Sequence, residues 1–310
     1  MTAGGSTPQH FADRLAALVE ERRSRVVLGL DPDPAALWPE ALARLAGGPD
    51  SPHLARARTA EAVTDHCRAA IVAAGPACVA VKPQLACFER LGPPGWEALE
   101  QVVAIASDHG LLVIGDGKRG DVPVTAAAYA QALVGSTPGP FGDVEGLGVD
   151  AFTANPLLGR DALEPLIDAA AAAGAGCFVL VRTSNPGAAE LQDEGEPALH
   201  ERLAGLVEEL GRDRRGDCGL SLVGAVTGAT RPEHLGRLRE LMPHAIFLLP
   251  GIGAQGGRVE SLGPAFAPHP AAGLVTASRS IVNAHSERGG DPADAAAAAA
   301  EELRAAAWAL

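Results

Sequence analysis

Four charged residues lie within six consecutive positions of this 310-residue chain, and their types and spacing suit acid–base chemistry. Asp116, Lys118, Arg119 and Asp121 follow an apolar run, Leu111–Ile114, which is typical of a buried strand. Side chains two apart on a strand point to the same face, so Asp116 and Lys118 are expected to project together. A carboxylate beside an ammonium group can orient a proton donor. The same pair could be a plain structural ion pair, and Asp121 alone would be an ordinary helix N-cap.

A second lysine makes a purely structural role for this cluster less favoured. Lys82 ends the apolar run "CVAVK", and a lysine at the end of a buried strand is costly unless it is paired. An alternating array of Lys82, Asp116, Lys118 and Asp121 would pair every charge. The sequence therefore predicts a site in which a lysine is held rigidly beside a carboxylate.

A glycine-rich stretch near the end of the chain predicts a phosphate site. The stretch "PGIGAQGG", residues 250–257, contains a G-x-G-x-x-G pattern. A dinucleotide site is disfavoured because the pattern comes late in the chain and the next strand ends in "TASRS", without the required acid. Backbone N–H groups of the loop, the Gln255 amide and the Arg279 guanidinium could instead hold phosphate oxygens. A glycine turn beside an ordinary surface arginine is the structural alternative.

Eight short apolar runs alternate with helical patterns, and strands buried on both faces have this continuous apolar character. The expected strands cover residues 25–30, 78–82, 111–115, 149–154, 176–181, 220–226, 245–249 and 272–277. The expected helices cover residues 53–74, 96–108, 125–134, 161–173, 198–211, 232–241 and 292–310, with an extra helix over residues 9–23. This order predicts an α/β protein with a (β/α)8 barrel (a TIM barrel), and an open doubly wound sheet is the alternative.

In such a barrel, the active site lies at the C-terminal ends of the strands. The polar residues at these predicted ends are Asp31, Lys82, Asp116, Lys118, Asn155, Arg182, Thr183, Ser184, Thr227, Ser278 and Arg279. These polar side chains from separate strands are therefore expected to lie together at the end of the barrel where the strands end, the barrel mouth. The stretch over residues 135–148 is expected to be a surface loop.

Composition and charge argue against several classes of protein. The formal net charge of −13 at pH 7 argues against nucleic-acid binding by this chain. No apolar run reaches the roughly 18 residues of a membrane helix, and the N-terminus lacks the features of a signal peptide. Five scattered cysteines without a C-x-x-C pair favour reduced thiols and a cytoplasmic location. We expect a single barrel domain over residues 1–310, with a helical extension over residues 1–24.

An ordered set of sequence blocks resembles one enzyme family. The blocks are "VKPQ", "DGKRGD", "NPLLG", "RTSNPG", "PGIGAQGG" and "TASRSI". The D-x-K-x-x-D pattern alone is moderately specific, but the ordered set is highly specific, and by it the chain is similar to bacterial orotidine 5′-phosphate decarboxylases. The resemblance implies a homodimeric barrel that converts orotidine 5′-phosphate to uridine 5′-phosphate, the last step of de novo pyrimidine synthesis. It also implies a pyrimidine nucleotide as the substrate, and no metal or organic cofactor.

The same resemblance implies a catalytic tetrad made of Lys82, Asp116, Lys118 and Asp121. In the family, the last aspartate reaches into the site of the neighbouring subunit. Thr125 matches a threonine that does the same, so the resemblance implies composite active sites in a homodimer.

The resemblance also implies a set of substrate-binding residues, namely Asp31, Thr125, Asn155, Ser184, Gln255, Gly256 and Arg279. Asp31 matches an aspartate that binds a ribose hydroxyl, and Ser184 matches a serine that hydrogen-bonds the pyrimidine amide. Gln255 and Arg279 match the ligands of the phosphate.

Two competing functions follow from the same residues. Sugar-phosphate decarboxylases and aldolases of this barrel superfamily share D-x-K-x-x-D but use Mg²⁺, with a further acidic ligand after the second strand. Lys82, Pro83 and Gln84 stand at that place, which disfavours a metal site. A non-catalytic barrel dimer is the other alternative, and the intact tetrad with its phosphate ligands argues against it.

Overall fold

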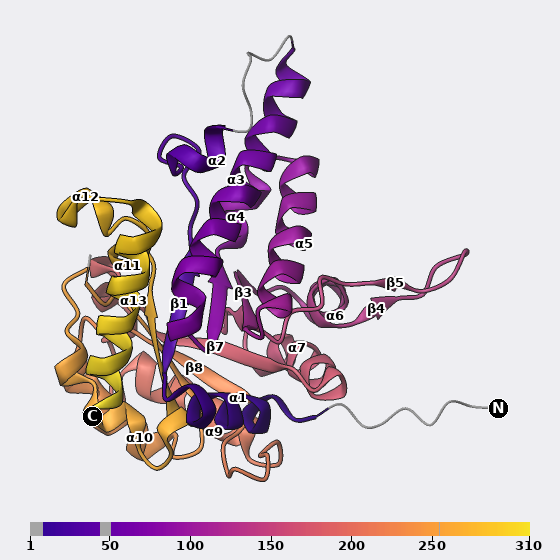
Figure 1. The fold of residues 1–310 in the computed structure, drawn as a ribbon. Helices are drawn as coiled ribbons and strands as arrows, with labels where there is room; N and C mark the ends of the chain where they lie inside the picture. The colour runs from indigo at the N-terminus through magenta and orange to yellow at the C-terminus, as the bar shows by residue number, and fades with distance from the viewer. Residues whose placement is uncertain (1–8, 44–50, 254) are drawn as a thin grey trace.

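The computed structural model describes residues 9–43, 51–253 and 255–310. Within these ranges, parallel strands close into a barrel in the order β1-β10-β9-β8-β7-β6-β3-β2. Figure 1 shows the course of the chain. The barrel strands are β1 (Val26–Leu30), β2 (Ala80–Pro83), β3 (Leu112–Arg119), β6 (Ala151–Ala154), β7 (Gly176–Arg182), β8 (Val223–Thr227), β9 (Phe247–Pro250) and β10 (Gly273–Ala277). The closed ring confirms the predicted (β/α)8 barrel and excludes the open doubly wound sheet.

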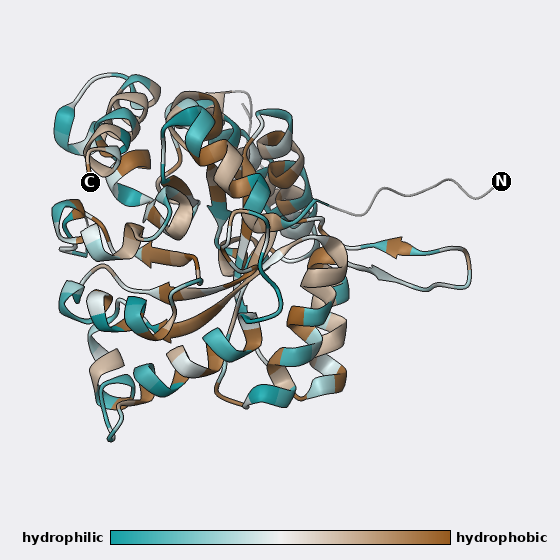
Figure 2. Cartoon of the chain, turned by 90° about the horizontal axis from the view of Figure 1, so that it is seen from below, coloured by the Kyte–Doolittle hydropathy of each residue, from teal (hydrophilic) through white to brown (hydrophobic). Residues whose placement is uncertain are grey.

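The barrel strands are buried on both faces, which explains their continuous apolar runs. Every residue of β1, β6, β8 and β10 is buried, and Figure 2 shows hydrophobic residues along the central strands. Phe178 fills the barrel interior so closely that a Cβ at Gly224 would lie 2.6 Å from its ring. Several strands begin later than predicted, because residues such as Leu222 and Ile246 are buried without belonging to a strand.

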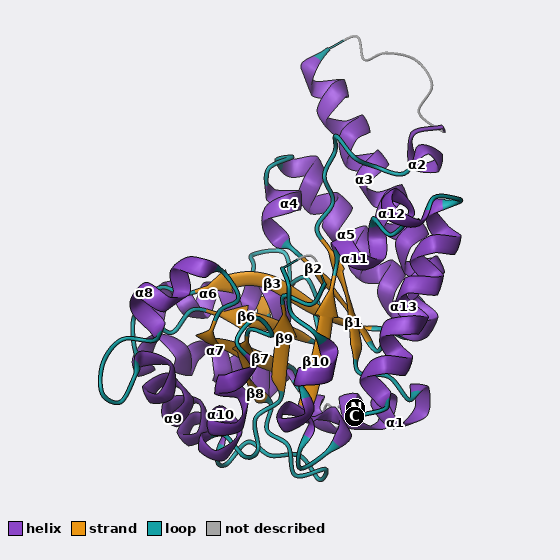
Figure 3. Cartoon of the chain, turned by 90° about the vertical axis from the view of Figure 1, so that its left-hand side faces the viewer, coloured by secondary structure: helices purple, strands orange, loops and turns teal. Residues whose placement is uncertain are grey.

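Helices surround the strands, as Figure 3 shows. The longer helices are α1 (Phe11–Arg22), α3 (Pro52–Ala74), α5 (Pro93–Asp108), α6 (Pro123–Val134), α7 (Arg160–Ala173), α9 (Leu199–Gly211), α10 (Leu235–Leu241) and α13 (Pro292–Trp308). The shorter helices are α2 (Pro39–Ala43), α4 (Leu85–Glu89), α8 (Ala189–Gln192), α11 (Arg279–Val282) and α12 (His285–Arg288). Helices α3, α5 and α6 begin before their predicted starts because proline fits the first turn of a helix. In the described part of the chain, no helix is long and apolar enough to cross a membrane.

Short 3₁₀ helices complete the connections between these elements. They are η1 (Gly75–Ala77), η2 (Pro186–Ala188), η3 (Pro232–His234), η4 (Val259–Ser261), η5 (Gly263–Phe266) and η6 (Pro270–Ala272). The predicted helix over residues 232–241 is divided between η3 and α10.

Helix α1 packs against the end of the barrel where the strands begin. Phe11 meets Phe178 edge-on, with 6.0 Å between the ring centroids. A Cβ at Gly176, the first residue of β7, would lie 2.5 Å from the Phe11 ring, so this close packing depends on glycine. The helix lies within its predicted range of residues 9–23. The barrel mouth, where the strands end, is left for the polar residues.

The predicted domain boundaries stay predictions. Residues 1–8 of the expected extension over residues 1–24 lie outside the described residues. The single domain over residues 1–310 is likewise an expectation from the sequence, although the barrel strands and their helices extend from residue 26 to residue 308.

The prediction of an irregular loop over residues 135–148 is wrong in part. Two short antiparallel strands, β4 (Ser136–Thr137) and β5 (Val144–Glu145), form a hairpin that projects away from the barrel (Figures 1 and 2). Phe141 near its tip is fully exposed. The hairpin could not be predicted from the sequence because its strands are only two residues long and are separated by a glycine- and proline-rich connection.

Candidate active site

The end of β3 departs from regular strand geometry at Lys118. Pairing with β6 is regular at Gly115, and the register then shifts before Arg119. Lys118 adopts a left-handed backbone conformation with a φ of 48°, which is uncommon for a residue with a side chain. The Thr153 hydroxyl accepts a hydrogen bond from the Lys118 backbone N–H at 2.8 Å. The Asp116 and Lys118 side chains therefore meet as predicted, but through a bulge rather than through simple alternation along a strand.

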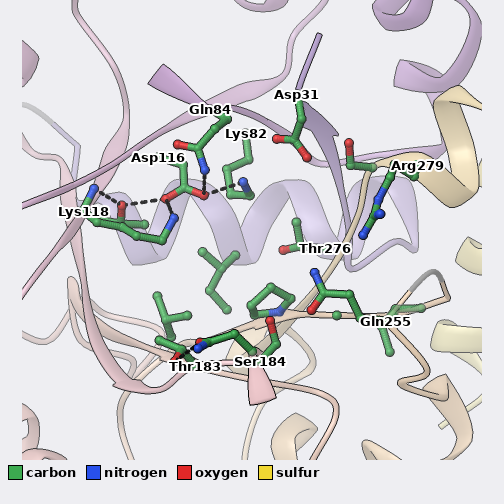
Figure 4. Close-up of a pocket in the computed structure, with 18 residues that line it drawn as sticks. Asp31, Lys82, Gln84, Asp116, Lys118, Thr183, Ser184, Gln255, Thr276 and Arg279 are labelled. Carbon is green, nitrogen blue, oxygen red and sulfur yellow. Dashed lines mark hydrogen bonds and ion pairs between the residues drawn. The ribbon is translucent and has the colours of Figure 1, made fainter. Parts of the chain in front are cut away.

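The Asp116 carboxylate is the centre of the charged cluster (Figure 4). Its Oδ2 atom lies 2.6 Å from Lys82 Nζ, and its Oδ1 atom lies 2.7 Å from Lys118 Nζ. The Thr153 hydroxyl also donates to Oδ1 at 2.9 Å, and the Gln84 amide donates to Oδ2 at 3.4 Å. Both carboxylate oxygens are thus occupied, and two ammonium groups are fixed on either side of one buried anion.

Opposing charges decide the protonation states in this cluster. Burial alone would raise the pKa of Asp116, but attraction to Lys82 and Lys118 and their hydrogen bonds hold it well below its usual range. Burial alone would lower the pKa of Lys82, but the charges of Asp116 and Asp31 raise it above its usual value. Asp116 and Lys82 are therefore ionised at neutral pH.

The two other charged residues of the opening stretch point elsewhere. Arg119 forms an ion pair with Glu89, and its guanidinium lies 5.3 Å from the centroid of the Tyr129 ring. Asp121 pairs with no lysine within the described part of the chain, and its carboxylate accepts a hydrogen bond from the Val122 backbone N–H at 2.8 Å. Of the predicted array of four charged residues, only Lys82, Asp116 and Lys118 come together within one chain.

The simple N-cap role for Asp121 is also wrong. The N-cap of α6 is Val122, which has no side-chain cap, because Pro123 begins the helix one residue later than an Asp121 cap requires. Thr125 is exposed in the first turn of α6. Neither Asp121 nor Thr125 lines the pocket of its own chain.

A pocket of about 330 Å³ opens at the barrel mouth beside the cluster. Nine of the residues predicted for the site or for the strand ends line it, namely Asp31, Lys82, Asp116, Lys118, Thr183, Ser184, Gln255, Ser278 and Arg279. Its apolar lining comes from residues that include Val226 and Leu248. The pocket thus combines an apolar surface with polar groups from several strands, as a small-molecule site requires.

The residues on the side of the pocket away from Asp116 suit an anion (Figure 4). Arg279, the first residue of α11, is exposed and has no ion-pair partner within the described residues. Gln255 also lines the pocket there. The Thr276 hydroxyl is buried and has no hydrogen-bond partner among the described residues, although it lies at the pocket wall. These groups are available to a ligand, whereas those around Asp116 are already paired.

Several predicted residues lie outside this pocket. The Asn155 side chain accepts a hydrogen bond from the Leu157 backbone N–H at 3.0 Å and so holds the turn after β6. Gly256, with a φ of 88°, belongs to the glycine-rich turn but does not line the pocket. Arg182 is buried and forms a two-point ion pair with Asp193, and Thr227 is fully buried. A position at a strand end therefore does not by itself place a side chain in the mouth.

The sequence-based predictions missed four polar residues of the pocket, namely Gln84, Thr153, Asn185 and Thr276. Gln84 and Asn185 lie within the quoted blocks "VKPQ" and "RTSNPG", so they could have been proposed from these motifs. Thr153 and Thr276 are threonines inside apolar strands, and strand patterning alone gives them no functional signal.

No three histidine, cysteine, aspartate or glutamate side chains come together in a metal-ligating arrangement within the described ranges. The five cysteines have free thiols.

Known proteins resemble this chain over most of its length. The model of the "Orotidine 5′-phosphate decarboxylase / HUMPS family" matches residues 24–298. An orotidine 5′-phosphate decarboxylase of Rhodopirellula baltica is 43% identical over 279 residues, 89% of each chain. One of Deinococcus radiodurans is 39% identical over 297 residues, 96% of this chain and 97% of the relative. The solved OMP decarboxylase of Leishmania donovani has a TM-score of 0.70 at 30% identity, and the match covers 96% of this chain and 99% of that one.

Proposed function

The chain belongs to the orotidine 5′-phosphate decarboxylase / HUMPS family, and on this premise we propose that it converts orotidine 5′-phosphate to uridine 5′-phosphate and CO₂. It is then a carboxy-lyase that performs the last step of de novo pyrimidine synthesis. The observation that carries the proposal is the Lys82–Asp116–Lys118 cluster, which fixes an ammonium group at the edge of the pocket.

The chemistry of the reaction explains the need for this ammonium group. Loss of CO₂ from C6 of the pyrimidine leaves a carbanion-like centre in the plane of the ring, where π-delocalisation cannot stabilise it. The Lys118 ammonium can lie beside the developing charge and then donate the proton to C6. Asp116 holds the Lys118 side chain before substrate enters, so little reorganisation is required during the reaction.

Asp116 would contribute a second effect from the same position. Its carboxylate would lie beside the carboxylate of the substrate, and this repulsion would be relieved as CO₂ leaves. Because both lysines keep its pKa low, Asp116 remains charged throughout the neutral range. Lys82 then balances the buried charge, and we assign the main catalytic role to Lys118.

The remaining pocket residues suit the non-reacting parts of the substrate. We assign Asp31 to a ribose hydroxyl and Ser184 to the pyrimidine amide. Gln255 and Arg279 are assigned to the phosphate, and the lack of an ion-pair partner for Arg279 in the described part of the chain supports this role. Asn155 and Gly256 stay predicted contacts, and their positions outside the pocket do not support them.

We further propose that the protein is a homodimer with composite active sites. Asp121 and Thr125 would enter the partner's site, since neither lines the pocket of its own chain. The apolar surface beside them supports this arrangement, because 55% of Val122 and 85% of Val124 are exposed. A cytoplasmic location is part of the same proposal, and the free cysteine thiols agree with it.

Turnover of orotidine 5′-phosphate should be unaffected by EDTA and by dialysis, because the two lysines already neutralise the carboxylate that a metal would need. The measurement is the loss of substrate absorbance with and without chelator, and a control restores Mg²⁺ to the treated protein. Loss of activity on chelation, with recovery on adding Mg²⁺, would instead favour a sugar-phosphate enzyme of the superfamily. Absence of turnover under every condition would favour a non-catalytic barrel dimer.

Replacement of Arg279 by alanine should weaken substrate binding strongly. A charge-assisted, two-point contact with phosphate is worth about 1.5–3 kcal/mol, so kcat/KM should fall by at least the corresponding factor. A competitive inhibitor that lacks phosphate should bind the variant and the wild type almost equally. Equal kcat/KM values for the two proteins would contradict the phosphate assignment.

A further inference from the structure

Gln192 lies outside the pocket but forms a two-point contact with the segment that follows β7. Its Oε1 atom accepts a hydrogen bond from the Thr183 backbone N–H at 2.8 Å, and its Nε2 atom donates to the Thr183 hydroxyl at 3.0 Å. The same hydroxyl lies 2.7 Å from Asn185 Oδ1. The Gln192 amide thus fixes both the backbone and the side chain of the residue before Ser184.

Other contacts hold the remaining backbone groups of this segment. The Thr183 carbonyl accepts a hydrogen bond from the Arg182 guanidinium, and the Ser184 carbonyl accepts one from the Thr230 hydroxyl at 3.1 Å. The packing is tight as well, because a Cβ at Gly228 would lie 2.8 Å from the Ser184 Cα. Among the described residues, no partner occupies the Ser184 N–H or its hydroxyl. These two groups are therefore left for a ligand in the pocket.

Hydrogen bonds of its own backbone and of the next residue fix the position of Gln192. Its carbonyl lies 2.7 Å from Nδ1 of the buried His200 ring. The next residue, Asp193, receives hydrogen bonds from the buried Arg182 at 2.8 and 3.0 Å. The same guanidinium also donates to the Thr183 carbonyl. One buried side chain therefore holds both the residue after Gln192 and the residue that Gln192 contacts. This arrangement fixes Gln192 relative to β7.

We propose that Gln192 is a positioning residue that orients Ser184 and thereby sets the selectivity of the pocket for a ring with an adjacent N–H donor and carbonyl acceptor. The inference rests on the proposed function, because it assigns Ser184 to the base of a pyrimidine nucleotide. Gln192 contacts no ligand and acts only through Thr183. Loss of its amide lets the segment shift, so recognition of the base weakens, while Asp31 and Arg279, which belong to other parts of the barrel, still bind ribose and phosphate.

The test compares a ligand that carries the pyrimidine base with one that carries a hydroxyl group in its place. Binding of uridine 5′-phosphate and of ribose 5-phosphate is measured by calorimetry on wild type and on Gln192→Met, which keeps the shape of the side chain but removes both hydrogen bonds. We expect uridine 5′-phosphate to bind the variant roughly 10-fold more weakly, with ribose 5-phosphate unchanged. Gln192→Glu keeps an acceptor for the Thr183 N–H and should recover part of the affinity. Gln101→Met, on the exposed face of α5, is the matched control and should bind both ligands normally.

Each outcome bears on the inference. Equal affinity of Gln192→Met and wild type for uridine 5′-phosphate would overturn it, as would an equal loss for both ligands, which indicates general loosening of the pocket. If Gln192→Met does not fold, as judged by circular dichroism, the same comparison on Gln192→Glu decides the question. Failure of wild type to bind uridine 5′-phosphate or to decarboxylate its precursor would refute the proposed function, and that result is separate from any difference between the variants.

Discussion

Lys118→Ala should lower kcat/KM for orotidine 5′-phosphate by roughly 10⁴-fold or more, since the variant loses both the cation beside C6 and the proton donor. The fold should persist, because the Lys118 side chain is 42% exposed and Asp116 keeps its contact with Lys82 at 2.6 Å. The expected result is thus a folded barrel with an intact phosphate site and almost no turnover.

Three measurements on Lys118→Ala separate chemistry from folding. Initial rates give kcat and KM, circular dichroism reports the fold, and calorimetry with uridine 5′-phosphate reports binding. Lys118→Arg is the matched variant, because it keeps a cation but replaces the compact ammonium with a guanidinium that does not release a proton at neutral pH. Near-normal turnover in a clean preparation of the alanine variant would refute the assignment.

Mixing two inactive variants should restore activity if Asp121 acts across a dimer interface. In a dimer of Lys118→Ala with Asp121→Ala, one composite site collects both changes and the other collects neither. About half of randomly assorted dimers are mixed, so activity should return to about a quarter of the wild-type value per site. The effect is large because each parent preparation is nearly inactive.

A matched mixture tests the geometry of this restoration. Asp116 and Lys118 belong to the same site of the same chain, so Lys118→Ala mixed with Asp116→Ala should recover no activity. Subunit exchange is verified with differently tagged chains. If exchange occurs and the first mixture also stays inactive, then Asp121 does not enter the partner's site, and its hydrogen bond to the Val122 N–H is its main contact.

The barrel was predictable because its strands are buried on both faces, and such strands consist of continuous apolar runs. Strand starts were less predictable, since Leu222 and Ile246 are as buried as strand residues without belonging to a strand. The β4–β5 hairpin escaped prediction because it buries little, and nothing in a two-residue strand forces an alternating pattern.

The part of the pocket that contains buried charges was predictable from the sequence. Lys82 and Asp116 could be paired from the sequence because a buried charge without a partner is costly. The left-handed conformation of Lys118 could not be inferred, since it depends on a register shift between β3 and β6. Gln192 was also missed, because its contact with Thr183 joins residues nine positions apart across an irregular connection.

The charged cluster has a practical consequence for chemical labelling. Of the 25 lysine and arginine residues in the sequence, only Lys82 and Lys118 are lysines, and both contact Asp116. An amine-directed reagent therefore meets no side-chain amine outside the pocket. Lys118 should react first, because the Lys82 side chain is only 8% exposed and its raised pKa keeps it protonated. Reductive methylation with a ¹³C-labelled reagent would thus place an NMR-visible methyl group in the pocket, at the proposed reacting centre, without mutagenesis.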